Sequence, residues 1–252
     1  MQVYVSLLPS MHAIDEQTEV AVVIDVLRAT SVMTKALESG AKSVVTCQEI
    51  DEARELARNL QPSPLLCGER ECKPIEGFNC GNSPAEYDVS TVADRDLVLT
   101  TTNGTRAIAA SQQAQQMLIG SFLNLSAIVD HIKSVQRLQL VCAGTNGEVT
   151  AEDTLLAGAI IDQLIRKQVK DSAAEVELCG DDAILAHELW KQWCPGDELP
   201  TPETLAGCLA KSRGGRNLIE VGFEFDLRHC AQVNSTRTVP KRFAINPPTF
   251  GR

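Results

Sequence analysis

The chain has 252 residues, of which 44% are hydrophobic and 22% are charged, and this is enough for one large globular domain or two smaller ones packed together. The formal net charge of -10 comes with no run of basic residues, so we expect neither nucleic acid nor a membrane surface as a partner. No apolar run approaches the roughly 20 residues of a membrane-spanning helix, and the first residues do not resemble a secretory signal. The nine cysteines form no Cys-x-x-Cys pair, so we predict reduced thiols in a cytoplasmic protein.

Short β-branched runs alternate with amphipathic stretches over the first two thirds of the chain. This alternation predicts an α/β fold with mostly parallel or mixed sheets flanked by helices in three layers. We expect an α/β core at 1–170 and a more helical part at 171–252 packed on it, with a soft boundary near 170–172 and a single domain as the alternative. The predicted strands are 3–7, 20–26, 43–47, 65–67, 96–100, 117–120, 138–142 and a closing strand near 239–245, and the predicted helices are 30–39, 51–60, 105–113, 125–134, 152–170, 181–193, 201–211 and 213–221.

Two further features concern the connections between these elements. Segment 68–84 is rich in Gly, Pro and Asn and predicts a long loop, which in a compact domain is usually functional or disordered. Segments 97–105 and 138–148 each read as a strand, then Thr-Asn-Gly, then a helix. This internal echo favours two related α/β units.

The first candidate site segment lies at the end of the apolar run 20–26. Asp25 stands near the carboxyl end of this predicted strand, where ligands bind in open parallel sheets, and a buried carboxylate there must be paired or hold a metal such as Mg²⁺. Arg28 could bind phosphate through two parallel hydrogen bonds, and Thr30 and Ser31 could donate hydroxyl and backbone N–H groups. The alternative is a buried Asp–Arg pair followed by an ordinary helix cap.

The second segment follows the predicted strand 65–67. Glu69 and Arg70 come directly after this strand, and Asn82 and Ser83 form a turn before a proline that can open a helix. Free N–H groups at such a helix start could bind an anion. An ordinary structured loop is the alternative.

The third segment is rich in hydroxyl groups and joins a strand to a helix. Successive backbone N–H groups there can form a phosphate-binding nest with the helix dipole behind it, although the phosphate-loop pattern of nucleotide hydrolases is absent. A capped strand-to-helix turn is the alternative. The candidate phosphate-binding residues of this segment are Thr101, Thr102, Asn103, Gly104 and Thr105.

The fourth segment opens the long helix predicted at 152–170. Glu152 and Asp153 in a first helical turn commonly complement the helix dipole. If they converge with Asp25 and Glu69, they would instead complete a Mg²⁺ site.

Five short motifs in one order give the sequence a specific resemblance. They are Val-Ile-Asp-Val-Leu-Arg-Ala-Thr-Ser at 23–31, Gly-Glu-Arg at 68–70, Gly-Phe-Asn-Cys-Gly-Asn-Ser-Pro at 77–84, Thr-Thr-Asn-Gly-Thr at 101–105, and Ala-Gly-Thr-Asn-Gly with Glu-Asp between 143 and 153. Together they resemble the 2-phosphosulfolactate phosphatase family. One departure is Asn79, where we expect an aspartate that could help to hold metal.

The resemblance implies a Mg²⁺-dependent hydrolysis of 2-phosphosulfolactate to sulfolactate and phosphate, a step of coenzyme M synthesis, or of a closely similar small phosphoester. It implies that Asp25, Glu69 and the acidic pair at 152–153 hold Mg²⁺, and that Arg28 and Arg70 bind phosphate or sulfonate. The alternative from another class is a phosphometabolite-binding module without turnover, for which added Mg²⁺ would not change binding. The physiological substrate, a covalent intermediate and a homo-oligomer are left open by the sequence.

Overall fold

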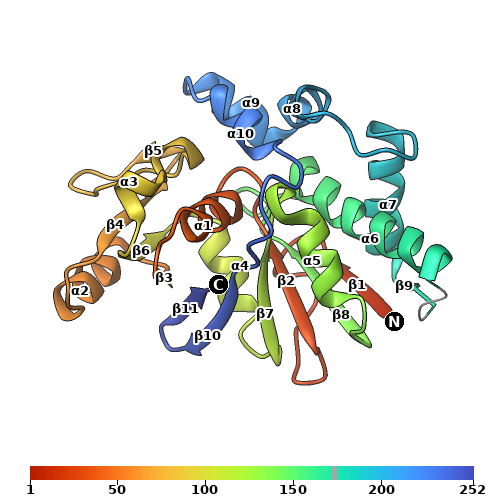
Figure 1. The fold of residues 1–252 in the computed structure, drawn as a ribbon, viewed down its shortest axis with the longest axis horizontal. Coiled ribbons are helices and arrows are strands. Elements are labelled where there is room, and N and C mark those ends of the chain that lie inside the picture. Colours follow the sequence, from red (N-terminus) through yellow and green to blue (C-terminus); the bar gives the residue numbers. More distant parts are fainter. Residues whose placement is uncertain (172–174) are drawn as a thin grey trace.

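The computed structural model describes residues 1–171 and 175–252 and shows an α/β fold (Figure 1). Within these residues the strands form one mixed sheet, and helices pack on both of its faces. The predicted fold class is therefore confirmed. The strands are β1 (Gln2–Ser6), β2 (Val20–Ile24), β3 (Ser43–Cys47), β4 (Leu65–Arg70), β5 (Lys73–Pro74), β6 (Asp96–Thr100), β7 (Gln116–Gly120), β8 (Arg137–Cys142), β9 (Glu177–Cys179), β10 (Lys241–Ile245) and β11 (Pro248–Gly251). The helices are α1 (Ala29–Glu38), α2 (Ile50–Asn59), α3 (Val89–Val92), α4 (Gly104–Ala110), α5 (Leu125–Ile132), α6 (Ala151–Asp171), α7 (Asp181–Trp193), α8 (Pro202–Lys211), α9 (Arg213–Glu220) and α10 (Phe225–Cys230), with 3-10 turns at Pro84–Glu86 and Phe122–Asn124.

The sheet consists of two parallel blocks joined by a hairpin, in the order β5-β4-β6-β3-β11-β10-β7-β2-β8-β1-β9. Strands β4, β6 and β3 form one block, and β7, β2, β8, β1 and β9 form the other. Between them, β11 pairs antiparallel with β3 and β10 pairs antiparallel with β7. The prediction of one closing strand near 239–245 was incomplete, because β11 is short and begins with a proline, and such a segment carries no strand signal.

Strand β2 shows why the sheet needs two helix layers. Val20, Val22 and Ile24 belong to the cluster that α5 and α6 cover, whereas Ala21 and Val23 belong to the cluster that α1 and α4 cover. Alternate side chains of a strand point to opposite faces, so a continuously apolar strand is stable only when both faces are buried. Each fully buried valine or isoleucine contributes roughly 1.5–3 kcal/mol of transfer free energy.

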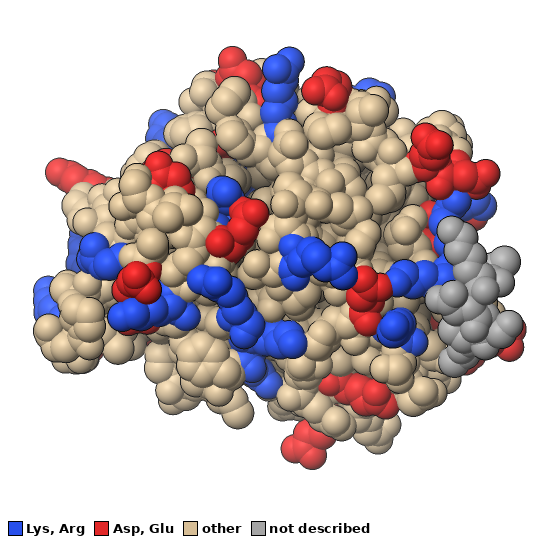
Figure 2. All heavy atoms as spheres, viewed as in Figure 1, with Lys and Arg blue, Asp and Glu red and all other residues tan. Residues whose placement is uncertain are grey.

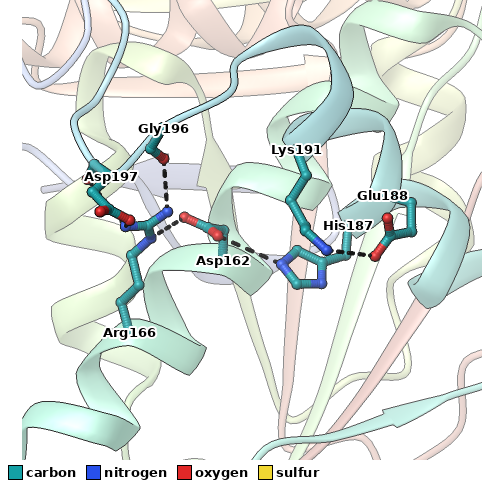
Figure 3. A network of polar contacts seen from close by, with 7 residues as sticks. All are labelled: Asp162, Arg166, His187, Glu188, Lys191, Gly196 and Asp197. Atoms are coloured by element: carbon teal, nitrogen blue, oxygen red, sulfur yellow. Dashed lines mark hydrogen bonds and ion pairs between the residues drawn. The ribbon is translucent and has the colours of Figure 1, made fainter.

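A polar network fixes α7 and the loop after it to α6 (Figure 3). Asp162 of α6 is buried, and its carboxylate lies 2.5 Å from Arg166 Nε and 3.5 Å from His187 Nε2. Arg166 also donates to the backbone oxygens of Gly196 at 2.9 Å and Asp197 at 3.1 Å. The network therefore holds α6, α7 and the loop after α7 together, at the opposite end of the sheet from α2.

One sequence expectation changes in the structure, and another stays a prediction. The segment predicted as a loop from residue 68 is partly strand, because β4 continues to Arg70 and turns back into β5. Strands β9, β10 and β11 of the C-terminal part pair with strands of the N-terminal part in the same sheet. The boundary expected near 170–172 reaches residue 172, which lies outside the described residues, so the division into two parts stays a prediction. Among the described helices, none is long and apolar enough to cross a membrane.

Candidate active site

A cleft of about 410 Å³ opens where the segments after β2, β4, β6 and β8 meet helix α9. The segments predicted separately from the sequence thus reach one place. The predicted residues that line the cleft are Asp25, Arg28, Glu69, Asn82, Thr102 and Asn103. The other residues that line it are Leu27, Glu71, Cys72, Lys73, Thr145, Asn146, Gly214, Asn217, Glu220 and Val221.

The twist of the sheet explains how both parallel blocks reach this cleft. Three antiparallel pairings separate the blocks, so their strands formally run in opposite directions. Neighbouring strands are rotated by about 20–25°, and the five steps from β6 to β2 therefore add up to roughly 100–125°. This rotation turns the carboxyl ends of the two blocks toward each other.

Asp25 is buried and has one carboxylate oxygen free. Its Oδ1 accepts a hydrogen bond from Ala29 N at 3.2 Å, whereas Oδ2 accepts none from the described residues. An added Cβ at Gly104 would come within 2.8 Å of Oδ2, so the glycine allows this close approach. Burial, with the negative charges of Glu69 and Glu152, raises the pKa of Asp25 to about 7, against the opposing effect of the Ala29 N–H. The site thus contains a carboxyl group that titrates near neutral pH.

Glu69 holds two loops of the cleft in place. Its Oε2 accepts from Cys72 N at 2.8 Å, and its Oε1 accepts from Thr102 N at 2.9 Å. One bond fixes the turn between β4 and β5, and the other fixes the loop after β6. Each oxygen of the Glu69 carboxylate already accepts one hydrogen bond from a backbone N–H and has one further lone pair.

The acidic pair that opens α6 is divided in its roles. Asp153 accepts from Val26 N at 2.8 Å and from Gly144 N at 3.0 Å, so it ties the loops after β2 and β8 together. Burial, with the charges of Glu152 and Asp25, holds the pKa of Asp153 well above its usual range. Glu152 Oε2 is buried without a partner, and burial also raises the pKa of Glu152. Of the two, Glu152 is the one with an unused acceptor.

The donor set fits a Mg²⁺ ion held by few protein ligands. Among the described residues, no group of three or more His, Cys, Asp or Glu side chains is arranged to hold a metal ion. The four predicted carboxylates therefore do not form a closed cage. Mg²⁺ usually takes only one or two carboxylates and completes its shell with water and phosphate oxygens. The free oxygens of Asp25 and Glu152 can supply these carboxylate ligands.

Arg28 lies in the cleft wall and is held by the C-terminal part of the chain. Its guanidinium pairs with Asp226 of α10, donates to Cys72 O at 3.0 Å, and stacks over the Phe223 ring at 4.7 Å from the centroid. Ser83 Oγ donates to the other oxygen of Asp226 at 2.5 Å. Sequence reasoning missed Asp226, because nothing in the local pattern near α10 points to a partner 198 residues away.

Several predicted residues bond to the protein itself and do not line the cleft. Arg70 donates to Glu69 O, Gln48 O and Thr100 Oγ1, so its guanidinium braces strand ends. The remaining hydroxyl groups bond to backbone or to a buried carboxylate: Thr30 to Asp25 O, Ser31 to Val26 O, Ser83 to Asp226, and Thr105 to Thr101 O. Asn79 is exposed, and its side chain accepts from Leu66 N at 2.8 Å, outside the cleft.

The two Thr-Asn-Gly turns of the internal echo touch each other. Asn146 N donates to Asn103 Oδ1 at 3.1 Å. Because the oxygen of this amide is engaged, its Nδ2 is left as a donor at the cleft wall. Asn146 has a φ of 53°, a conformation that asparagine tolerates better than most residues. The echo noticed in the sequence therefore corresponds to two turns that build one site.

The turn between β4 and β5 brings a cation that the sequence did not reveal. Glu71 and Cys72 have φ values of 53° and 63°, as in a two-residue type I′ hairpin. Such turns usually contain Asn-Gly, and Glu-Cys gives no such signal. The hairpin sets Lys73 at the cleft, which Asn217 and Glu220 of α9 also line.

Partnerless polar atoms gather around the cleft. In the described chain, six buried side-chain nitrogen or oxygen atoms have no hydrogen-bond partner, and two of them, Ser39 Oγ and His229 Nε2, lie elsewhere. Of the other four, Asn82 Oδ1 and Thr102 Oγ1 belong to residues that line the cleft, Thr101 Oγ1 belongs to the residue before Thr102, and Glu152 Oε2 belongs to a carboxylate that lies against the lining residue Gly214. An unsatisfied buried polar group costs about 1–3 kcal/mol, so this concentration indicates a polar ligand, an ion or ordered water in the cleft.

Comparison with known proteins identifies the family. The sequence profile of the family described as 2-phosphosulpholactate phosphatase matches residues 7–243. The chain belongs to this family. Members of the 2-phosphosulfolactate phosphatase family are phosphoric monoester hydrolases, so the resemblance seen in the five motifs and the predicted enzyme class are confirmed.

Three relatives carry the name "Probable 2-phosphosulfolactate phosphatase" and are similar along most of their length. The protein of Thermotoga maritima is 40% identical over 220 residues, 87% of each chain. That of Caldanaerobacter subterraneus subsp. tengcongensis is 37% identical over 234 residues, 92% of this chain and 91% of its own. That of Clostridium acetobutylicum is 36% identical over 226 residues, 89% of this chain and 90% of its own. The residues that line the cleft described above all lie within the matched region.

Proposed function

We propose that this protein is a Mg²⁺-dependent phosphatase that converts 2-phosphosulfolactate and water to sulfolactate and inorganic phosphate, in the synthesis of coenzyme M in the cytoplasm. Membership of the family supports the phosphatase reaction, and the names of the relatives supply the substrate. The observation that carries the proposal is the cleft itself, which is lined by Asp25 with its free carboxylate oxygen and by Asn82 and Thr102, each of which has a buried polar atom without a partner among the described residues.

Asp25 is the proposed principal Mg²⁺ ligand, and Glu152 is the second. Asp25 offers Oδ2, and Glu152 offers Oε2, neither of which has a partner among the described residues. A bound Mg²⁺ would neutralise phosphoryl charge and lower the pKa of a coordinated water. Glu69 and Asp153 support this arrangement, because their carboxylates fix the loops on which the ligands and donors stand.

The remaining cleft residues recognise the anionic substrate. Arg28 presents a fixed guanidinium, which suits a phosphate group better than a mobile ammonium does. Asn103 and Asn82 add neutral amides that can donate to phosphoryl oxygens without adding charge. Lys73 stands on the exposed hairpin rim, where it can pair with the carboxylate or sulfonate of the same substrate.

Phosphate release tests the proposal. The substrates are racemic 2-phosphosulfolactate, phospholactate and p-nitrophenyl phosphate, each with Mg²⁺ and with EDTA. We expect Mg²⁺-dependent release that favours the sulfonate, and a loss of about 10²–10³ in kcat for Asp25→Asn, as for other groups that stabilise transition-state charge. Asp51→Asn is the matched control, because Asp51 is exposed on α2 and its one ion pair among the described residues is with Arg54.

Other outcomes would replace the proposal. Mg²⁺-dependent release that favours another ester would keep the reaction and discard the pathway. No release from any ester, together with ligand-induced thermal stabilisation that Mg²⁺ leaves unchanged, would show a phosphometabolite-binding module instead.

A further inference from the structure

A second hollow, of about 600 Å³, lies between α5 and the start of β10. It shares no lining residue with the active-site cleft. Figure 2 shows Lys and Arg side chains crossing the middle of this face, in the region of α5 and the β10–β11 hairpin of Figure 1. The hollow is lined by Ala127, Asp130, His131, Arg237, Thr238, Val239, Lys241 and Arg252.

Among the described residues that line this hollow, Asp130 has the one acidic side chain, and its charge is already neutralised. Asp130 pairs with Lys167, and Arg237 Nη2 donates to it at 3.3 Å. The hydrogen bond from Lys167, with the positive charges of Lys167, Arg237 and Lys133, holds the pKa of Asp130 below its usual value. Asp130 therefore has little charge left with which to stabilise further cations.

Three of the residues that line the hollow have basic side chains without a partner among the described residues. Within the described part of the chain, His131, Lys241 and Arg252 take part in no ion pair and their side chains make no hydrogen bond. Burial and the nearby charge of Lys241 lower the pKa of His131. Basic side chains close to one another repel. Because the chain as a whole has a net charge of -10, this cluster makes the electrostatic potential locally positive on a protein that is negative overall.

We propose that this hollow binds a small anion with at least two negative charges, of the phosphate or carboxylate type. Such an anion would give Lys241 and Arg252 the counter-charge that the described residues do not supply, and it would accept a hydrogen bond from the His131 ring. No Phe, Tyr or Trp side chain is among the lining residues, so the hollow lacks the large aromatic faces on which nucleobases usually stack. The Thr238 hydroxyl and the small walls of Ala127 and Val239 leave room for a compact polyanion.

Histidine NMR with pyrophosphate as the probe tests this proposal. The chain has four histidines, so the His131 ring signal can be assigned with one His131→Gln variant. No histidine lines the active-site cleft, so a shift of the His131 signal reports the second hollow even when pyrophosphate also occupies the cleft. A parallel titration with citrate distinguishes a phosphate site from a carboxylate site.

We expect pyrophosphate to move the His131 signal in a saturable way, with weaker binding at high salt because exposed charges are screened. Lys241→Glu should weaken this binding by about tenfold or more, whereas Lys191→Glu, an exposed lysine on α7 that pairs with Glu188, should not. Should Lys241→Glu fail to fold, Arg252→Gln gives the same test at an exposed position.

The proposal is overturned if millimolar pyrophosphate and citrate leave the His131 signal unchanged, or if Lys241→Glu and Arg252→Gln bind as tightly as the unaltered protein. Neither result depends on the proposed phosphatase activity, because the reaction plays no part in the measurement. A protein inactive on every phosphoester could still bind pyrophosphate at His131, and an active one could fail to do so.

Discussion

Replacing Arg28 by alanine should produce a phosphatase that free guanidinium ion partly reactivates, provided that Asp226 is intact. The guanidinium of Arg28 occupies a defined niche made by the Asp226 carboxylate, the Cys72 carbonyl oxygen and the face of Phe223. Arg28→Ala removes the guanidinium group and leaves the three groups that surround it in place. A soluble guanidinium ion can then enter this niche and present the same cation to the substrate.

The expected size follows from burial and charge. The side chains of Arg28 and Asp226 are each 2% exposed, and removing one partner of a buried pair usually costs about 3–5 kcal/mol of stability. Because Ser83 Oγ still donates to Asp226 at 2.5 Å, we expect the lower part of that range. Loss of one group that stabilises transition-state charge lowers kcat by about 10²–10³. If the free guanidinium ion restores about 1.4 kcal/mol of this stabilisation, the rate rises about tenfold.

The assay compares kcat/KM for Arg28→Ala and for Arg28→Ala with Asp226→Asn, at guanidinium concentrations that leave Tm unchanged. We expect rescue in the first protein and none in the second, because the amide lacks the charge that holds the ion. Equal rescue in both, or equal rescue by methylammonium, would refute the idea that Asp226 positions this cation. Full activity of Arg28→Ala would show that the pair only attaches α10 to the sheet.

Three further predictions concern the metal, a glycine and the α6–α7 network. The pKa of Asp25 is about 7 in the fold against a usual value of 3.8, so the metal-free protein loses stability as the pH rises from about 4 to about 7 and the carboxyl group gives up its proton. Mg²⁺ binds the deprotonated carboxylate, so it should raise Tm more near pH 8 than near pH 6. Asp25→Asn should abolish this difference. Gly104→Ala would place a Cβ 2.8 Å from Asp25 Oδ2 and should weaken Mg²⁺ binding in calorimetry, whereas Gly207→Ala, with nothing within 4 Å, should not. Asp162→Asn should lower the free energy of unfolding in urea by about 1–3 kcal/mol, and a loss no larger than that of the exposed-pair variant Glu188→Gln, about 0–1 kcal/mol, would contradict this.

The sequence predicted part of the cleft from the rule that ligands bind at the carboxyl ends of parallel strands, and it missed the residues to which this rule does not apply. Asp25, Glu69 and Asn103 were found because each follows or ends a predicted strand, and ligands bind at the carboxyl ends of parallel strands. Lys73 was missed because it follows a tight turn whose residues are atypical of such turns. Asp226 was missed because its role depends on a contact that only the folded chain creates.

Residue type alone did not separate the groups that line the cleft from those that support it. The hydroxyl groups of Thr30 and Thr105 were as credible as that of Thr102 from sequence, yet the first two bond to backbone oxygens and only the third lies at the cleft. Period and spacing place a residue on an element, whereas the direction of a single side chain in an irregular loop depends on packing. The same limit applies to Arg70, which turns to Gln48 O and away from the cleft.

The β10–β11 hairpin has a consequence for synthesis of the chain on the ribosome. β10 and β11 are the last strands in chain order, yet they fill the position between β3 and β7 in the sheet. A nascent chain therefore exposes two unpaired strand edges, one on each parallel block, until residues 241–251 have emerged. During this interval both edges are open to pairing with strands of other chains, which is the usual route by which incomplete sheets aggregate.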